Sequence, residues 1–253
     1  MTDAGARVAI VTGGSRGIGR AIVERLLRDG MAVVTCGRGE RPADLPERAV
    51  WVTADVSRAE DASRVAAKAA EHGDIAALVN NAGIQIEKTV PETSDAEWDR
   101  LVGVNCRGVF NMCRAVIPLM AESGGDIVNL GSISAMVADP SMAIYNASKG
   151  FVHALTRSIA VDHGPMVRCN AVSPGWIMTG MAESGFALAS DPARARADSI
   201  ARHPARRFGR PEDVANAVVW LISAESAFVT GHCITIDGGL TAASPLNQDY
   251  SDD

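Results

Sequence analysis

Short apolar runs alternate along the chain with longer stretches in which apolar residues recur at helical spacing. The runs are too short for helices and end in turn-forming residues, so they are predicted to be buried strands. These strands are expected at residues 8–11, 32–36, 49–52, 76–79, 126–130, 167–172 and 234–237. The helical spacing predicts helices at 18–28, 59–71, 94–120 and 144–162, and a last helix that starts at Pro211.

This alternation predicts an α/β fold of the Rossmann type, a doubly wound, seven-stranded parallel sheet with helices on both faces. The 253 residues contain no internal repeat and no dividing linker, so one domain is expected. Residues 176–210 are irregular and dotted with arginine, which predicts a functional lid or substrate loop. Residues 242–253 are expected to be a polar tail, mobile unless a neighbouring subunit orders it.

A glycine-rich turn at residues 13–19 lies between the first predicted strand and the first predicted helix. Glycines let the backbone approach a pyrophosphate, and the start of a helix offers free N–H groups and a positive dipole end. A glycine cluster alone is a weak signal, but its place between these two elements predicts a phosphate site.

The second predicted strand ends in Gly37-Arg38, where folds of this type meet the adenosine ribose. A carboxylate there would repel a 2′-phosphate, whereas Arg38 can bind one, with Arg16 as a second cation. We therefore predict NADP(H) in preference to NAD(H); the alternative is that Arg38 is a solvated loop charge. Asp55 and Val56, after the third strand, are candidates for contact with adenine.

Tyr145 and Lys149 are four residues apart in a predicted helix and therefore share one of its faces. A free tyrosine has a pKa near ~10, and a nearby ammonium lowers that pKa toward the working range of an acid or base. Such a pair also arises by chance as two half-buried side chains. Ser132, upstream of the pair at the end of the fifth predicted strand, is a further polar group in this region.

Taken together, residues 6–241 resemble the short-chain dehydrogenase/reductase family. The resemblance rests on motifs in family order, namely Thr12-Gly13-x-x-x-Gly17-x-Gly19, 80–83 (NNAG), Ser132, Tyr145-x-x-x-Lys149, Pro174-Gly175, 210–215 (RPEDVA), 229–231 (VTG) and 237–239 (DGG). It implies an NAD(P)-dependent oxidoreductase that transfers hydride between the nicotinamide and a secondary alcohol or ketone. The segment 37–48 departs from the pattern, because Pro42 and Pro46 leave room for no more than a short helical turn.

The resemblance also implies roles for single residues. Tyr145 would be the general acid/base, Ser132 would hold the substrate oxygen, and Lys149 would lower the pKa of Tyr145 and bind the nicotinamide ribose. Asn105 would anchor a water that connects Lys149 to solvent. The expected cofactor-binding residues are Gly13, Ser15, Arg16, Gly17, Ile18, Gly19, Arg38, Asp55, Val56, Asn81, Ala82, Gly83, Tyr145, Lys149, Pro174, Gly175, Ile177 and Thr179.

Two alternatives stay open at this point. One is a reductase of 3-oxoacyl thioesters on an acidic carrier protein, for which the arginines of 194–207 would form a basic entrance. The other is a redox sensor that binds the cofactor without turnover. Ser134, Gln85, Met136, Trp176, Met178, Met181 and Phe186 are candidates for the substrate pocket.

Composition excludes several other classes. The net charge of -6 disfavours nucleic acid as the main partner, and no apolar run reaches the ~18 residues of a membrane span. The first residues do not have the pattern of a signal peptide, so a cytoplasmic protein is expected. The five cysteines and five histidines are scattered, which predicts free thiols and no metal site. Family analogy alone predicts a homotetramer that acts on a small-molecule carbonyl or alcohol substrate.

Overall fold

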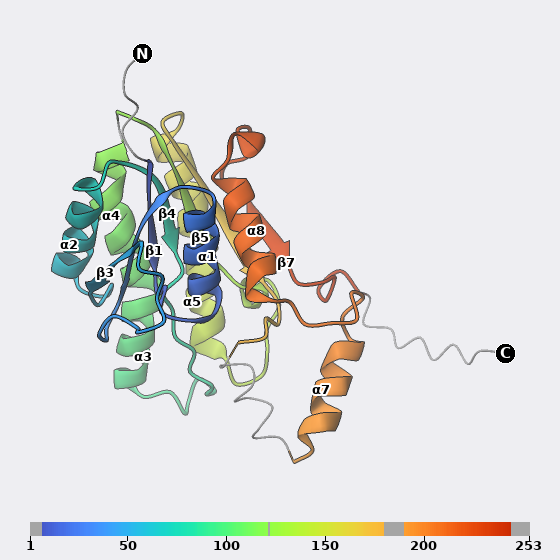
Figure 1. Ribbon diagram of the computed structural model, residues 1–253. Coiled ribbons are helices and arrows are strands. Elements are labelled where there is room, and N and C mark those ends of the chain that lie inside the picture. Colours follow the sequence, from blue (N-terminus) through green and yellow to red (C-terminus); the bar gives the residue numbers. More distant parts are fainter. Residues whose placement is uncertain (1–6, 121, 180–189, 244–253) are drawn as a thin grey trace.

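The computed structural model describes residues 7–120, 122–179 and 190–243. All seven predicted strands form one parallel sheet in the order β3-β2-β1-β4-β5-β6-β7 (Figure 1). The strands are β1 Arg7–Thr12, β2 Ala32–Gly37, β3 Ala49–Thr53, β4 Asp74–Asn80, β5 Gly125–Leu130, β6 Val167–Pro174 and β7 Cys233–Ile236. The order reverses between β1 and β4, and ligands of such sheets bind beyond the carboxyl ends of the strands at this switch point.

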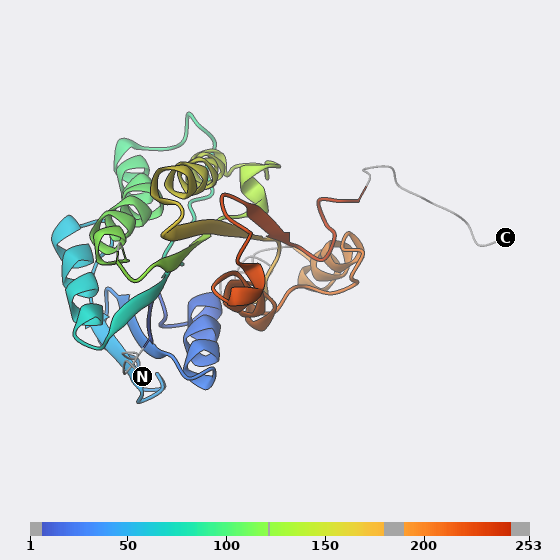
Figure 2. The same ribbon diagram turned by 90° about the horizontal axis from the view of Figure 1, so that it is seen from above.

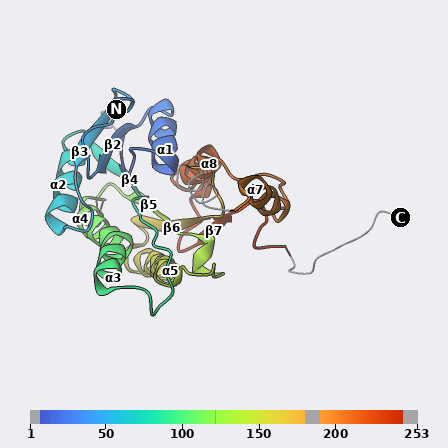
Figure 3. The same cartoon turned by 90° about the horizontal axis from the view of Figure 1, so that it is seen from below.

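Helices cover both faces of the sheet, as predicted (Figures 2 and 3). On one face lie α1 Gly17–Arg28 and α8 Pro211–Leu221, and on the other lie α2 Ala59–Ala70, α4 Val109–Met120 and α5 Ala143–His163. Along β1, Val8 and Ile10 pack into the core on the α2, α4 and α5 side, while Ala9 and Val11 pack into the core on the α1 and α8 side. Because both faces are buried, the strands read as continuous apolar runs.

The single helix predicted over 94–120 is interrupted. It begins with the expected capping box of Ser94 and Glu97 and forms α3 Asp95–Val102, but a π-helical turn at Gly103–Gly108 precedes α4. At Gly108 a Cβ would lie 2.6 Å from Cγ2 of Val56, so the glycine allows this turn to pack against the residue that follows β3. π-Helical turns are frequent at functional sites, and this one carries Asn105.

The prediction that 176–210 is irregular throughout is wrong, because it contains the helix α7 Pro192–Ala201. Asp191 caps this helix by accepting a hydrogen bond from the Arg194 amide at 3.0 Å, and Pro192 lies in the first turn. The helix has no buried residue, so it leaves no apolar period in the sequence. Residues 180–189, including the pocket candidates Met181 and Phe186, and the tail from 244 onward lie outside the described residues.

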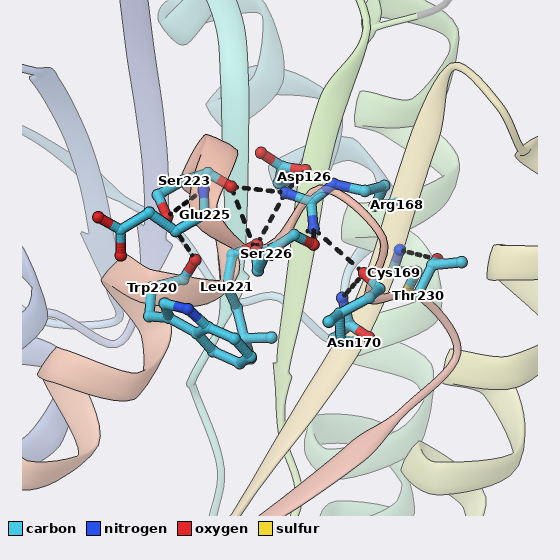
Figure 4. A network of polar contacts seen from close by, with 11 residues as sticks. Asp126, Arg168, Cys169, Asn170, Trp220, Leu221, Ser223, Glu225, Ser226 and Thr230 are labelled. Carbon is cyan, nitrogen blue, oxygen red and sulfur yellow. Dashed lines mark hydrogen bonds and ion pairs between the residues drawn. The ribbon is translucent and has the colours of Figure 1, made fainter.

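A polar network closes the end of the sheet opposite the candidate site (Figure 4). Arg168, near the start of β6, pairs with Asp126 of β5 at 2.8 Å. Its guanidinium also donates to the carbonyl oxygens of Leu221 and Ser226, at 3.0 and 2.6 Å. These bonds attach the end of α8 and the 3-10 turn Ala224–Ser226 to the sheet.

Among the described residues, no helix is long and apolar enough to cross a membrane.

Candidate active site

The glycine-rich turn is held against the end of β4. Thr12 Oγ1 accepts hydrogen bonds from the amides of Asn81 and Ala82, each at 3.0 Å, and Asn81 Nδ2 donates to the Thr12 carbonyl at 2.8 Å. Gly17 has φ 59°, and a Cβ at Gly19 would lie 2.3 Å from the Gly13 carbonyl oxygen, so both positions require glycine.

The first turn of α1 offers backbone donors to a phosphate. Its N-cap residue, Arg16, has extended backbone and makes no capping hydrogen bond through its side chain. The first amides of the helix are therefore not satisfied by that side chain, and the positive end of the helix dipole adds to the attraction for an anion. This turn fits the pyrophosphate of a dinucleotide cofactor.

The tip of β2 places a second cation beside the turn. Arg38 and Arg16 are exposed, and within the described ranges neither side chain has a hydrogen bond or ion pair. Their neighbours are engaged: Arg20 binds Asp44, and Arg41 donates to the Ala49 carbonyl at 2.7 Å. The segment 38–48 has no helix, as its prolines predict.

The two residues expected near adenine lie after β3. Asp55 Oδ1 accepts from the amide and hydroxyl of Ser57 at 3.0 and 2.7 Å, and Val56 is buried. The Asp55 carboxylate is thus used to form the turn into α2, and the Val56 side chain packs against Gly108.

Asn105 connects the end of β4 to α5. Its Oδ1 accepts from the Ile84 amide at 2.9 Å, and its Nδ2 donates to the Ile84 carbonyl at 2.9 Å and to Ser148 Oγ at 3.1 Å. The residue is 1% exposed. A Cβ on Gly83 would lie 3.4 Å from Asn105 Oδ1 and 3.9 Å from Lys149 Nζ, so these groups meet at one point.

Ser132 lies two residues beyond the end of β5 and caps the 3-10 turn Ile133–Ala135. Its hydroxyl donates to Ser134 Oγ at 3.0 Å and accepts from the Ser134 amide at 3.1 Å. The Ser132 side chain also interacts with Tyr145 and opposes the rise in the pKa of its phenol. Ser132 therefore lies between the β5 turn and the tyrosine of α5.

Tyr145 and Lys149 lie on the same face of α5, as their spacing predicts. Lys149 Nζ is 5.6 Å from the centroid of the Tyr145 ring and donates to the Leu130 carbonyl at 2.7 Å. Lys149 is 7% exposed, and burial lowers its pKa from 10.5 to about 8.

The sequence predicts that the Lys149 ammonium lowers the pKa of Tyr145, but in the structure this pKa is raised. Burial raises the pKa of Tyr145, the interaction with Ser132 acts in the opposite direction, and the negative charge of Asp139 raises the pKa further. Helical spacing predicts the neighbouring ammonium correctly, but it does not show how deeply the phenol is desolvated.

Of the residues predicted to hold the nicotinamide, Pro174 ends β6, and Gly175, Ile177 and Thr179 follow it. The Gly175 amide donates to the Ile236 carbonyl at 3.0 Å, and Ile177 forms an isolated bridge with Gly209. A Cβ at Gly17 would lie 3.5 Å from Thr179 Cγ2, so this segment reaches back to the phosphate turn. The expected cofactor residues thus surround one edge of the sheet.

A cavity of about 280 Å³ adjoins this edge. Its lining includes Ile133, next to Ser132, and Asp139, whose charge acts on Tyr145. The full lining is Ile133, Val137, Asp139, Trp176, Ser199, Arg202, His203, Leu240, Thr241 and Ala243.

Of the residues expected in the pocket, Trp176 lies in this lining. Four others among the described residues lie outside it. Ser134 bonds to Ser132, Gln85 donates to Glu87, and Met136 is exposed. Met178 donates its amide to the Gly209 carbonyl and is not in the lining. Ser199 of α7 and the two residues that follow this helix, Arg202 and His203, also line the cavity. No motif in the sequence predicts this.

A buried pair behind the site, His153 and Ser173, is not predicted from the sequence. His153, one turn beyond Lys149 on α5, has Nε2 at 2.7 Å from Ser173 Oγ, and both side chains are buried. A Cβ on Gly131 would lie 2.6 Å from His153 Nε2, so the pair fills the space beneath the residue that precedes Ser132. Burial and the charges of Arg157 and Lys149 lower the pKa of His153.

Comparison with known proteins identifies the family. Residues 13–241 match a protein-family model described as Enoyl-(Acyl carrier protein) reductase. The 2-(S)-hydroxypropyl-CoM dehydrogenase 3 of Xanthobacter autotrophicus is 40% identical over 247 residues, which are 93% of this chain and 96% of that protein. The chain belongs to the short-chain dehydrogenase/reductase family.

Other members agree with this assignment. The NADP-dependent (R)-specific alcohol dehydrogenase of Lentilactobacillus kefiri is 36% identical and covers 93% of this chain, which spans 97% of that protein. The ligand-free structure of Thermoplasma acidophilum aldohexose dehydrogenase has a TM-score of 0.90 at 35% identity and covers 97% of this chain and 98% of that one. As a short-chain dehydrogenase/reductase, the chain is an NAD(P)-dependent oxidoreductase of alcohol and carbonyl groups.

Proposed function

We propose that Tyr145 is the general acid/base of this oxidoreductase and that Ser132 holds the substrate oxygen. The observation that carries the proposal is the convergence of three side chains: Ser132 interacts with Tyr145, and the buried Lys149 places Nζ 5.6 Å from the tyrosine ring. When bound, the nicotinamide cofactor supplies or accepts the hydride. In reduction, Tyr145 donates a proton to the carbonyl oxygen; in oxidation, it removes the proton from the alcohol.

Ser132 and Lys149 support this proton transfer in different ways. Ser132 donates a hydrogen bond to the reacting oxygen and fixes its position. The Lys149 ammonium stabilises the Tyr145 phenolate and binds the nicotinamide ribose, which places the ring beside the substrate. Asn105, held between Ile84 and Ser148, orders a water between Lys149 and solvent.

The preferred cofactor in this proposal is NADP(H). Arg38 and Arg16 are the support, because they lie at the β2 tip and the phosphate turn and have no partner among the described residues. A guanidinium forms charge-assisted hydrogen bonds with a 2′-phosphate, and no carboxylate precedes Glu40 at the tip to repel it. The Lentilactobacillus kefiri relative is named as NADP-dependent, which agrees with this choice.

The proposed substrate is a small secondary alcohol or ketone. A thioester on an acidic carrier protein would require a cationic entrance of several free arginines. Arg194 pairs with Asp198 and Arg207 pairs with Asp213. Arg206 donates to the Ala201 carbonyl, which leaves Arg202 without a partner among the described residues. Arg196 packs over the Phe208 ring. The retained Ser132 and Tyr145 speak against a redox sensor, which has no use for a proton donor.

The test is to mix the protein with NADPH and a panel of ketones, and with NADP⁺ and the matching alcohols, and to follow the absorbance of the reduced cofactor. The proposal expects turnover of small substrates and none of carrier-linked thioesters. Cofactor binding without turnover across the panel would instead identify a sensor.

We also propose a homotetramer, because α4 and α5 expose the large apolar side chains of Phe110, Phe151 and Val161. Light scattering measures the mass of the assembly and tests this proposal.

A further inference from the structure

The cavity lined by Ile133, Asp139 and Trp176 has a definite chemical character. It is bounded by the turn after β5, the residue after Gly175, the end of α7 and the segment after β7. Trp176, Ile133, Val137 and Leu240 supply apolar surface, and the rest of the lining is mostly polar. Asp139 lies at the tyrosine side and Arg202 comes from the end of α7, so the opposite charges in the lining balance.

The hydroxyls of the lining have already donated their protons. Ser199 Oγ donates to the Ala195 carbonyl at 2.8 Å, and Thr241 Oγ1 donates to Asp237 Oδ2 at 2.6 Å. Each oxygen therefore remains only as an acceptor toward a ligand. The Asp139 carboxylate is also an acceptor, and among the described residues it has no hydrogen bond or ion pair.

His203 adds to the excess of hydrogen-bond acceptors over donors in the lining. It is 2% exposed, and its Nδ1 lies 2.8 Å from the Ser199 carbonyl oxygen, which can only accept, so Nδ1 carries the proton. In the tautomer with its proton on Nδ1, Nε2 is an acceptor, and it has no partner among the described residues. Arg202 is exposed and is the donor side chain that remains; it too is unpaired within the described ranges.

An acceptor-rich lining selects a ligand that is rich in O–H donors. A carboxylate, phosphate or sulfonate brings only acceptors and meets the negative charge of Asp139. A simple hydrocarbon alcohol leaves the polar lining without partners, which costs free energy. Balanced charge and several acceptors are the pattern that fits a neutral polyol, with Arg202 donating to one of its oxygens.

We propose that this cavity is a polyol-recognition site, in which Asp139 and Arg202 bind hydroxyl groups remote from the reacting carbon. The substrate of the oxidoreductase is then a small, neutral polyhydroxylated alcohol or carbonyl compound. This inference rests on the proposed function for the reacting centre, but its binding site is defined by separate residues.

Calorimetry on the enzyme with NADP⁺ tests the site without requiring turnover. The probes are myo-inositol and cyclohexanol, which share a ring and differ in hydroxyl groups, with 2-aminocyclohexanol and 3-hydroxybutyrate as the amine and anion. We expect myo-inositol to bind about tenfold more tightly than cyclohexanol, since polar sites reject analogues that lack their hydroxyl groups. Asp139→Ala and Arg202→Leu should reduce this ratio at least about fivefold, whereas Arg194→Leu, on the same helix outside the lining, should preserve it.

Equal or weaker binding of myo-inositol overturns the inference, and so does tightest binding of the amine or the anion. Absorbance assays with the same compounds separate the two claims. Polyol binding that depends on Asp139 and Arg202 without any cofactor reduction upholds the site and contradicts the proposed chemistry. Turnover of cyclohexanol with no preference for the polyol upholds the proposed chemistry and contradicts the polyol site.

Discussion

The Lys149 ammonium donates a hydrogen bond to the Leu130 carbonyl oxygen across 2.7 Å. This bond joins α5, which carries Tyr145, to the end of β5, which leads into Ser132. The lysine therefore fixes the distance between the two side chains proposed to contact the substrate oxygen. Because it is buried to make this bond, its charge carries a cost that depends on pH.

Replacing Lys149 by methionine should change how stability depends on pH. Burial lowers the pKa of Lys149 from 10.5 to about 8, so between these values the unfolded state binds more protons than the folded state. Stability contributed by this group therefore rises with pH across that window, by on the order of 3 kcal/mol in total. Urea unfolding from pH 7 to 11 should give a smaller rise with pH, or a steeper fall, for Lys149→Met than for wild type.

Lys68 is the matched control for this experiment, because it is a partly exposed lysine in a surface pair with Glu71. Lys68→Met should follow the wild-type pH dependence. If Lys149→Met follows it too, the ammonium is not buried as described. Lys149→Met should also weaken cofactor binding and lower kcat together, since the ammonium is proposed to act in both.

Arg38→Ala tests the cofactor preference. Loss of charge-assisted hydrogen bonds to a 2′-phosphate should lower kcat/KM for NADPH by roughly tenfold to a hundredfold, with little change for NADH. Arg48→Ala, an exposed arginine of the neighbouring segment, is the control and should leave both values near wild type. A wild-type enzyme that already prefers NADH would contradict the NADP(H) proposal.

The buried pair of His153 and Ser173 should act as a positioning unit. His153→Ala and Ser173→Ala each remove the 2.7 Å contact beneath Gly131, and each should lower kcat by roughly tenfold while KM changes less. The double variant should lose little more than either single variant, because the two act through one contact. Additive losses, or no recovery with His153→Gln, would assign the pair to general packing.

The Arg168 network should contribute to stability rather than catalysis. Arg168→Met leaves the Asp126 carboxylate without its partner in a largely buried position, which should reduce the free energy of unfolding by about 3 kcal/mol. The comparable change in an exposed pair, Arg194→Met, should cost less than about 1 kcal/mol. Guanidinium unfolding measures both; equal losses would show that the network contributes no more than an exposed pair.

The fold follows from the sequence because most of its elements leave a periodic record. Strands buried on both faces read as apolar runs, and the capping residues of α3 and Pro211 of α8 mark the starts of their helices. Helix α7 leaves no such record, because none of its residues is buried. The π-helical turn at Asn105 is likewise invisible, since its neighbours keep helical spacing on either side.

The candidate site is predictable to the extent that its residues lie at strand ends. Asn81 and Gly175 follow strands directly, and Ser132 lies two residues beyond β5, so parallel topology alone brings them to one edge. Asp139, Arg202 and His203 meet at the cavity through loops and through α7, and the sequence gives no rule for such contacts. The Tyr145 pKa depends on the depth of burial, which residue spacing does not show.

The most direct test of the account is the turnover of Tyr145→Phe with its best substrate. The substitution removes only the phenolic oxygen, so kcat should fall by at least about a hundredfold while NADPH binding, measured by fluorescence titration, stays near wild type. Tyr250→Phe, the same change at the chain's other tyrosine, should keep normal kcat. A near-normal kcat for Tyr145→Phe would contradict the assignment of Tyr145 as the acid/base.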